Sequence, residues 1–193
     1  MSVQAKESTR KPRADGQRNR ERLIEIAKMA FAEVGADVSL EEIARRAKVG
    51  IGTLYRHFPT RDAIVEAVYR REVQQLAEAA TRLLETVPPG QALHQWMRLF
   101  VDYIATKKVI APALGVIASG GSDLFAVSSA QIIDAVTRLV SAATAASAVR
   151  PDVDPTDLLR ALIGFTYGNT NPGWRDSALR LIDILMDGLR PVR

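Results

Sequence analysis

Apolar residues recur along most of the chain at the three- and four-residue spacing of an α-helix, and no window shows the sustained alternation of a β-strand. The pattern predicts helices at about 17–34, 40–47, 51–58, 61–87, 93–106, 123–148, 155–168 and 174–187. The segment 109–122 is also apolar, but we expect its proline, Pro112, and its three glycines to break it. The expected fold is therefore all-α, with about nine helices.

Several helix boundaries carry local chemical signals. Gly35 follows the first helix at the position where a left-handed cap is favoured. Ser39, with Glu42 three residues later, reads as the start of a capping box. Thr60 is placed to cap the helix that follows it, and Asp154 precedes a proline in a first turn. These boundaries therefore rest on side-chain chemistry as well as on periodicity.

The excess positive charge lies in the first third of the chain. The net charge is +4, and residues 1–58 hold 12 Lys and Arg against 8 Asp and Glu. Residues 1–16 are polar and contain Pro12 and Gly16, so we expect a disordered basic arm. One interpretation is a solvated tail. The other is a partner that carries phosphates, which a basic arm binds with release of counterions.

Composition also excludes several classes of protein. The chain has no Cys and only two His, His57 and His94, so we expect no disulfide, no metal site, no cofactor and no enzymatic activity. The N-terminus does not resemble a signal peptide. The longest apolar run, Val109 to Ala118, is too short to span a bilayer. We therefore expect a soluble cytoplasmic protein without a membrane partner.

The two short helices at 40–47 and 51–58 have the properties of a helix-turn-helix unit. Such a unit needs small or apolar residues where the helices pack, and the chain supplies Ile43, Ala44, Ala47, Val49 and Leu54. The start of the second helix must approach DNA, and Gly50 and Gly52 leave room for this approach. Its outer side offers donors and acceptors on Thr53, Tyr55, Arg56 and His57. The pattern indicates a reader of the major groove.

The residues of this unit resemble a known family. The stretches Ser39–Ala44, Val49–Phe58 and Arg61–Asp62 closely resemble the DNA-binding domain of the tetracycline-repressor (TetR) family, and the string from Gly52 to Phe58 is the most specific part. The resemblance covers about residues 17–76. It implies a three-helix DNA-binding domain at 17–76 and a larger helical domain for effector binding and dimerisation at 77–193.

The resemblance also implies roles for individual residues. Thr53, Tyr55 and His57 would lie on the recognition helix, with Tyr55 and His57 mainly holding phosphates. Arg45 would reach a base or a phosphate, and Arg61, where the family usually has Lys, would bind a backbone phosphate. Positions 50–52 lack a polar side chain, so base contacts would concentrate on Thr53 and Arg56. The expected DNA-binding set is Arg45, Gly50, Ile51, Gly52, Thr53, Tyr55, Arg56, His57 and Arg61.

Each of these residues also has a plainer interpretation. His57 can be a simple surface residue, and Tyr55 can be in part a core ring. Arg45 and Arg46 can be a solvated helix face. The full motif favours contact with DNA for His57, while the two arginines remain evenly balanced.

Three aromatic residues, Trp96, Phe100 and Tyr103, follow one another at helical spacing. Such a stripe is often plain core. In the TetR family the equivalent region surrounds an effector pocket, so a pocket lined by these rings, with contributions from Phe125 and Phe165, stands beside the interpretation as core. Aromatic walls suit a hydrophobic organic ligand with few polar groups.

The last two helices, about 155–168 and 174–188, resemble the dimerisation pair of the family. We expect a homodimer interface, with the alternative that these faces are buried within one subunit. The expected interface set is Leu158, Leu162, Phe165, Leu179, Ile182, Leu185 and Met186. The function implied is a repressor that a small-molecule effector releases from a palindromic, double-stranded operator. The alternatives are a helical ligand-binding or scaffold protein that does not touch DNA, and an enzyme.

Overall fold

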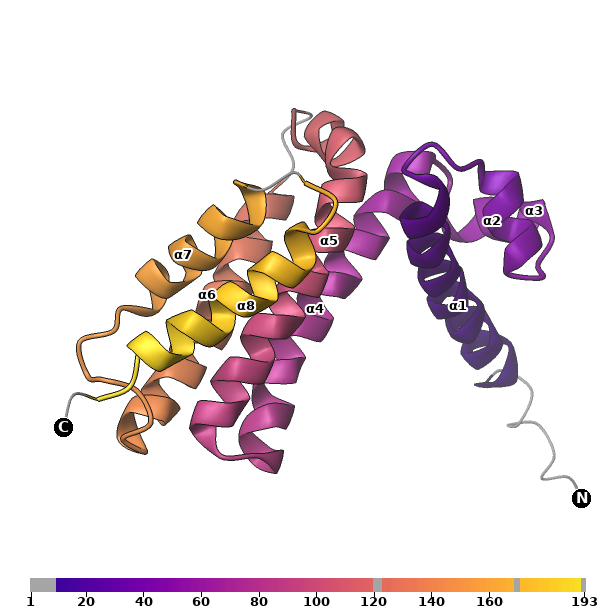
Figure 1. Ribbon diagram of the computed structural model, residues 1–193. Helices are drawn as coiled ribbons and strands as arrows, with labels where there is room; N and C mark the ends of the chain where they lie inside the picture. Colours follow the sequence, from indigo (N-terminus) through magenta and orange to yellow (C-terminus); the bar gives the residue numbers. More distant parts are fainter. Residues whose placement is uncertain (1–9, 120–122, 169–170, 192–193) are drawn as a thin grey trace, which may run out of the picture. The chain divides into compact units, whose positions relative to one another are not determined.

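The computed structural model describes residues 10–119, 123–168 and 171–191, and their side chains from residue 15 onward. These residues form eight helices and no strand, which confirms the all-α prediction (Figure 1). The helices are α1 (Arg10–Val34), α2 (Leu40–Arg46), α3 (Ile51–His57), α4 (Arg61–Thr86), α5 (Pro89–Ser119), α6 (Leu124–Ala145), α7 (Pro155–Tyr167) and α8 (Trp174–Gly188).

A first compact unit extends to Tyr69 and includes residues 109–117. In it, α2 packs against both α1 and α3. Leu23, Phe31 and Ile43 are buried between these helices. Gly35 ends α1 with a φ of 99° and donates its N–H to the carbonyl of Phe31, so the predicted left-handed cap is confirmed.

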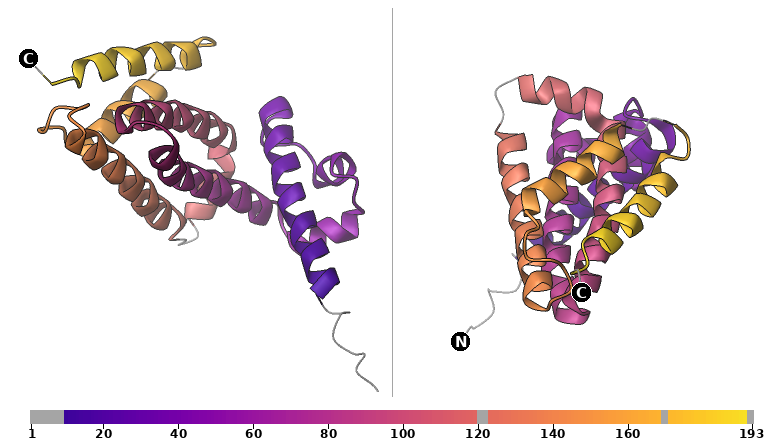
Figure 2. Two further views of the ribbon diagram at one scale, coloured as in Figure 1. Left: turned by 90° about the horizontal axis from the view of Figure 1, so that it is seen from below. Right: turned by 60° about the vertical axis from the view of Figure 1, so that its left-hand side comes forward.

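The second unit comprises residues 70–108 and the chain from residue 118 onward. It contains most of α4 and α5, with α6, α7 and α8 (Figures 1 and 2). Helix α7 contacts both α6 and α8. The carboxylate of Asp154 accepts the N–H groups of Thr156 and Asp157 at 2.6 and 3.1 Å, which confirms the predicted start of α7.

Two predicted boundaries were wrong. Helix α5 runs without interruption through Pro112, so the expected break between 106 and 123 lies only after Ser119 and the count of nine helices falls to eight. Proline removes one hydrogen bond from a helix interior, and the thirty-one-residue helix retains the others. Helix α1 begins at Arg10, and Pro12 is tolerated in its first turn because the N–H that proline lacks would have no partner there. The rest of the expected basic arm, residues 1–9, lies outside the described residues.

Helix α6 is the one described helix that is long and apolar enough to cross a membrane, judged by length and composition alone. Its apolar side chains include Leu124, Ile132, Val136 and Leu139, which are buried within the second unit. Packing of α6 against α7 within the second unit accounts for its apolar composition.

Candidate nucleic-acid interface

The turn between α2 and α3 is built by local hydrogen bonds. Ser39 Oγ accepts the N–H of Glu42 at 3.1 Å and caps α2. At the other end of α2, the N–H of Val49 donates to the carbonyl of Ala44. Lys48 lies in the left-handed region with φ of 54°, a conformation that costs a non-glycine residue free energy. This turn brings α3 back across α2 as a helix-turn-helix unit requires.

One side of helix α3 packs against the core of the first unit, and the other side is exposed. Leu54 is fully buried, and Phe58 directly after α3 is 1% exposed. The guanidinium of Arg20 on α1 lies 5.2 Å from the centre of the Phe58 ring, a cation–π contact that the sequence did not predict. These contacts hold α3 rigidly against the core of the first unit.

The residues between positions 50 and 57 that the sequence assigned to DNA lie at the start and along the surface of α3, whereas Arg45 lies on α2 and Arg61 on α4. Gly50, Ile51, Gly52, Tyr55 and Arg56 are exposed, and Thr53 and His57 are half-buried. The Tyr55 side chain is 44% exposed, which argues against the interpretation of Tyr55 as a core ring. The small residues at 50 and 52 leave the start of α3 open, and no atom lies within 4 Å of a Cβ built on either glycine. Most of the predicted DNA-binding residues therefore lie on the surface of α3 that the buried Leu54 leaves open.

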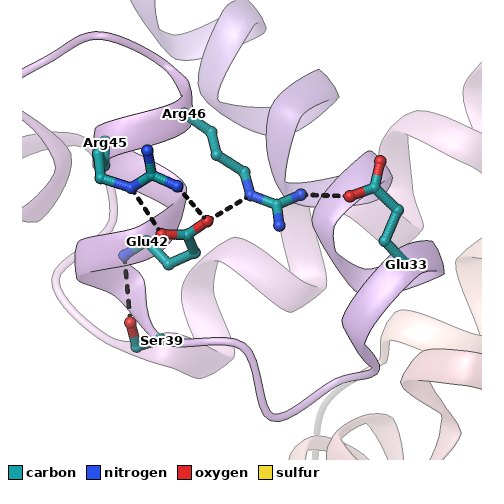
Figure 3. Close-up of polar contacts among 5 residues, drawn as sticks. All are labelled: Glu33, Ser39, Glu42, Arg45 and Arg46. Atoms are coloured by element: carbon teal, nitrogen blue, oxygen red, sulfur yellow. Dashed lines mark hydrogen bonds and ion pairs between the residues drawn. The ribbon is translucent and has the colours of Figure 1, made fainter.

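Four charged side chains form a chain of ion pairs across α2 (Figure 3). Both carboxylate oxygens of Glu42 accept from Arg45, from Nε at 2.8 Å and from Nη2 at 2.7 Å. One of them also accepts from Nε of Arg46 at 2.7 Å, and Nη1 of Arg46 donates to Glu33 of α1 at 2.5 Å. The hydrogen bonds from Arg45 and Arg46 lower the pKa of Glu42 from 4.5 to about 2. Glu42 is therefore ionised at neutral pH.

Arg61 does not simply project towards solvent as predicted for a phosphate contact. Its Nη1 donates to the carbonyl of Val38 at 2.8 Å, so the side chain ties the start of α4 to the segment before α2. Its Nη2 is buried and has no hydrogen-bond partner among the described residues. Sequence reasoning missed this role because the partner lies twenty-three residues away. Contact between Arg61 and DNA stays a prediction.

Comparison with known families and proteins agrees with this geometry. Residues 23–68 match the family model described as "Bacterial regulatory proteins, tetR family". Residues 88–191 match the model described as "Transcriptional regulator SbtR-like, C-terminal domain". The chain belongs to the TetR family.

Individual TetR-family proteins resemble it over different lengths. A TetR transcriptional regulator from Streptomyces coelicolor is 43% identical, with a TM-score of 0.82 over 90% of this chain and 99% of that chain. A TetR regulator from Mycobacterium vanbaalenii is 36% identical, with a TM-score of 0.76 over 93% and 99%. An HTH-type transcriptional regulator of Staphylococcus aureus (strain USA300) is 30% identical over 103 residues, 53% of this chain and 54% of the relative. The match spans about half the length of that curated relative.

In the second unit, the aromatic stripe on α5 is packed as core. Trp96, Phe100 and Tyr103 are at most 5% exposed, with ring centres 5.9 and 5.6 Å apart along the stripe. Nε1 of Trp96 donates to the carbonyl of Leu76 at 2.9 Å, so its polar atom is satisfied within the chain. These rings therefore have the contacts of a packed core. Lining of an effector pocket by them stays a prediction.

A cavity of about 490 Å³ lies elsewhere in the second unit. None of the five predicted pocket residues lines it; Phe125 and Phe165 are half-buried away from it. The cavity is lined by Pro88, Gly90, Gln91, His94, Ala148, Asp183, Met186, Asp187 and Arg190. Among the lining residues, His94 Nε2 lies 2.7 Å from Asp183 Oδ1, and Asp187 pairs with Arg190 at 2.9 Å. Four polar side chains of this cavity, His94, Asp183, Asp187 and Arg190, thus have partners within the chain.

Three residues of the predicted dimer interface are buried within a single chain, as the alternative interpretation of these helix faces expects. Leu158, Leu162 and Ile182 are at most 4% exposed within a single chain, so they belong to its own core and offer no surface to a second copy. Phe165, Leu179, Leu185 and Met186 are half-buried. The exposed apolar side chains of α7 and α8 are neighbours of the predicted ones: Ile163, Tyr167, Leu181 and Ile184. We call these four the α7–α8 stripe.

Proposed function

We propose that this chain is a homodimeric, sequence-specific DNA-binding transcriptional regulator. The observation that carries the proposal is the exposed side of α3, where Tyr55 and Arg56 lie on a helix anchored by the buried Leu54. A rigid helix with an open N-terminus and polar groups on its outer side is suited to the major groove. The family to which the chain belongs supports this reading over a scaffold that does not bind DNA.

The α7–α8 stripe supports a dimer formed by a second copy of the chain. Ile184 is 66% exposed and Ile163 is 42% exposed, so the stripe is apolar and open in a single chain. Gly164 lies next to Ile163 within α7, three residues before the helix ends at Tyr167. It has no left-handed φ, and no described atom lies within 4 Å of a Cβ built on it. Glycine within a helix costs about 1 kcal/mol relative to Ala. Close approach of a second α7 explains why glycine is suited to this position.

The regulator acts as a repressor that a ligand releases. The effector binds the second unit and must prefer the conformation that does not fit the operator, with a coupling of typically about 1–3 kcal/mol. We keep the expectation of a hydrophobic organic effector near Trp96, Phe100, Tyr103, Phe125 and Phe165. Because the three rings of the stripe are in contact, the effector has to enter beside them or separate them. The working compartment is the cytoplasm.

The test is selection of purified full-length protein against random duplex DNA. A dimer with two α3 helices should enrich two inverted half-sites about 10 base pairs apart, centre to centre, or a multiple of this spacing. Arg56→Ala should reduce preference at one position of each half-site. Glu25→Gln on exposed α1 is a control whose preference should stay that of the wild type. If the wild-type protein enriches no sequence, the proposal of specific DNA binding is wrong.

A further inference from the structure

We propose that Glu42 is a positioning residue that holds Arg45 ready to read a guanine base in the operator. The inference rests on the proposed function, because it needs a DNA partner. It concerns α2, whereas the motif assigns base reading mainly to α3. The chain of ion pairs in Figure 3 carries it.

The guanidinium of Arg45 has two edges, and Glu42 occupies only one of them. Nε and Nη2 of Arg45 donate to the two carboxylate oxygens of Glu42 at 2.8 and 2.7 Å. The adjacent edge at the end of the guanidinium, formed by Nη1 and the second hydrogen of Nη2, retains two parallel donors. The Arg45 side chain is 73% exposed. A fixed pair of donors therefore faces outward from the last turn of α2.

Arg46 keeps Glu42 in place while Arg45 acts. Arg46 lies between Glu42 and Glu33, at 2.7 and 2.5 Å, and its side chain is only 27% exposed. It therefore ties α2 to α1 and is poorly placed to reach a partner outside the chain. The two arginines, which the sequence left equal, have different roles in the structure. The Arg45 side chain is exposed, and the Arg46 side chain forms ion pairs within the chain that join α2 to α1.

Charge favours a base over a phosphate as the partner of Arg45. The carboxylate of Glu42 directly beside Arg45 offsets its positive charge, and this weakens a general attraction to phosphates. The two-donor geometry is unaffected, and it matches the O6 and N7 acceptors of guanine in the major groove. The start of α3 has Gly50, Ile51 and Gly52, which carry no polar side chain. A held arginine on α2 supplies readout that these positions do not.

The experiment compares full-length variants on the operator found by selection and on operators with each base pair changed. Glu42→Gln frees Arg45, and Arg45→Lys keeps the charge without the two-donor edge. Both should lose about tenfold of the preference for the same guanine in each half-site. Glu41→Gln is the matched control, since it makes the same charge change one residue away on an exposed carboxylate without an ion pair among the described residues. It should leave base preference unchanged.

The salt dependence of binding separates a base contact from a phosphate contact. Arg45→Ala should lower affinity mainly at the guanine position, and its salt slope should stay close to that of the wild type. If Arg45→Ala weakens binding equally on all sequences and lowers the slope by about one phosphate, Arg45 binds backbone and the inference is wrong.

The outcome for Glu42 is separable from the outcome for the protein as a whole. A wild-type protein that selects an operator, with Glu42→Gln and Arg45→Lys keeping its base preference, overturns this inference alone. A wild-type protein that selects no operator overturns the proposed function as well. Arg45→Lys changes an exposed side chain and tests the guanine contact in a folded chain. If Arg45→Lys loses the preference while a folded Glu42→Gln variant keeps it, Glu42 does not position Arg45 and the inference is wrong.

Discussion

Replacing Gly164 by Ala should stabilise the single chain and weaken the dimer. Gly164 lies inside α7, and the Cβ that alanine adds meets no described atom within 4 Å. The single chain should therefore gain up to about 1 kcal/mol of helix stability. In a two-fold dimer packed through α7, the same substitution inserts two methyl groups into the interface. Overpacking of this kind costs about 1–3 kcal/mol, which raises the dimer Kd about 5- to 150-fold.

The two effects are separated by varying protein concentration. Sedimentation over a dilution series measures the dimer Kd, and urea unfolding at several concentrations separates chain stability from association. Gly16→Ala in α1 is the control, because it also adds a methyl group without a described atom within 4 Å. It should raise stability and leave the Kd unchanged. If Gly164→Ala behaves like this control, α7 does not pack closely against a second copy and the argument from glycine fails.

Four further variants test other features. Lys48→Gly should raise the free energy of unfolding by about 0.5–1 kcal/mol, because it relieves a φ of 54°; an unchanged urea midpoint would contradict the strain. Leu162→Ala should lower the free energy of unfolding by about 2–5 kcal/mol at any protein concentration, since Leu162 is buried in the core. Ile184→Glu should instead give a folded monomer that no longer binds the operator. The pKa of Glu42 is lowered from 4.5 to about 2, so its ion pairs stabilise the fold fully above pH 4.5 and are lost as the pH falls towards 2. The urea midpoint of the wild type should therefore fall over this pH interval, and the midpoint of Glu42→Gln should fall less.

Local chemistry explains which boundaries could be predicted. The caps at Ser39, Thr60 and Asp154 join a side chain to a backbone N–H two or three residues away, and each is present in the structure. The left-handed conformation of Gly35 was predictable for the same reason, because it depends only on the residues next to the end of α1. Pro112 is the counterexample. It is a helix breaker by propensity, but the helix around it continues, and propensity is a weak guide when a long helix is packed on its neighbours.

The exposed and buried sides of α3 were predictable from the sequence. Periodicity decides that Leu54 faces inward and Tyr55 outward, because they are successive positions on one short helix. It says nothing of Arg61, whose guanidinium turns towards Val38, or of Arg46, which reaches Glu33 on another helix. Those contacts join residues thirteen to twenty-three positions apart, so only the folded chain brings them together.

By itself, the sequence determined the helical class, the helix-turn-helix unit and the apolar character of the last two helices, since all three depend on residues within one or two turns of each other. The tertiary structure alone decided which apolar side of α7 and α8 is core. Leu162 and Ile163 are adjacent and both apolar, yet one is buried and the other is 42% exposed. A helix that is apolar on two sides has two candidate faces for its own core, and packing against α6 selects one of them and leaves the other open.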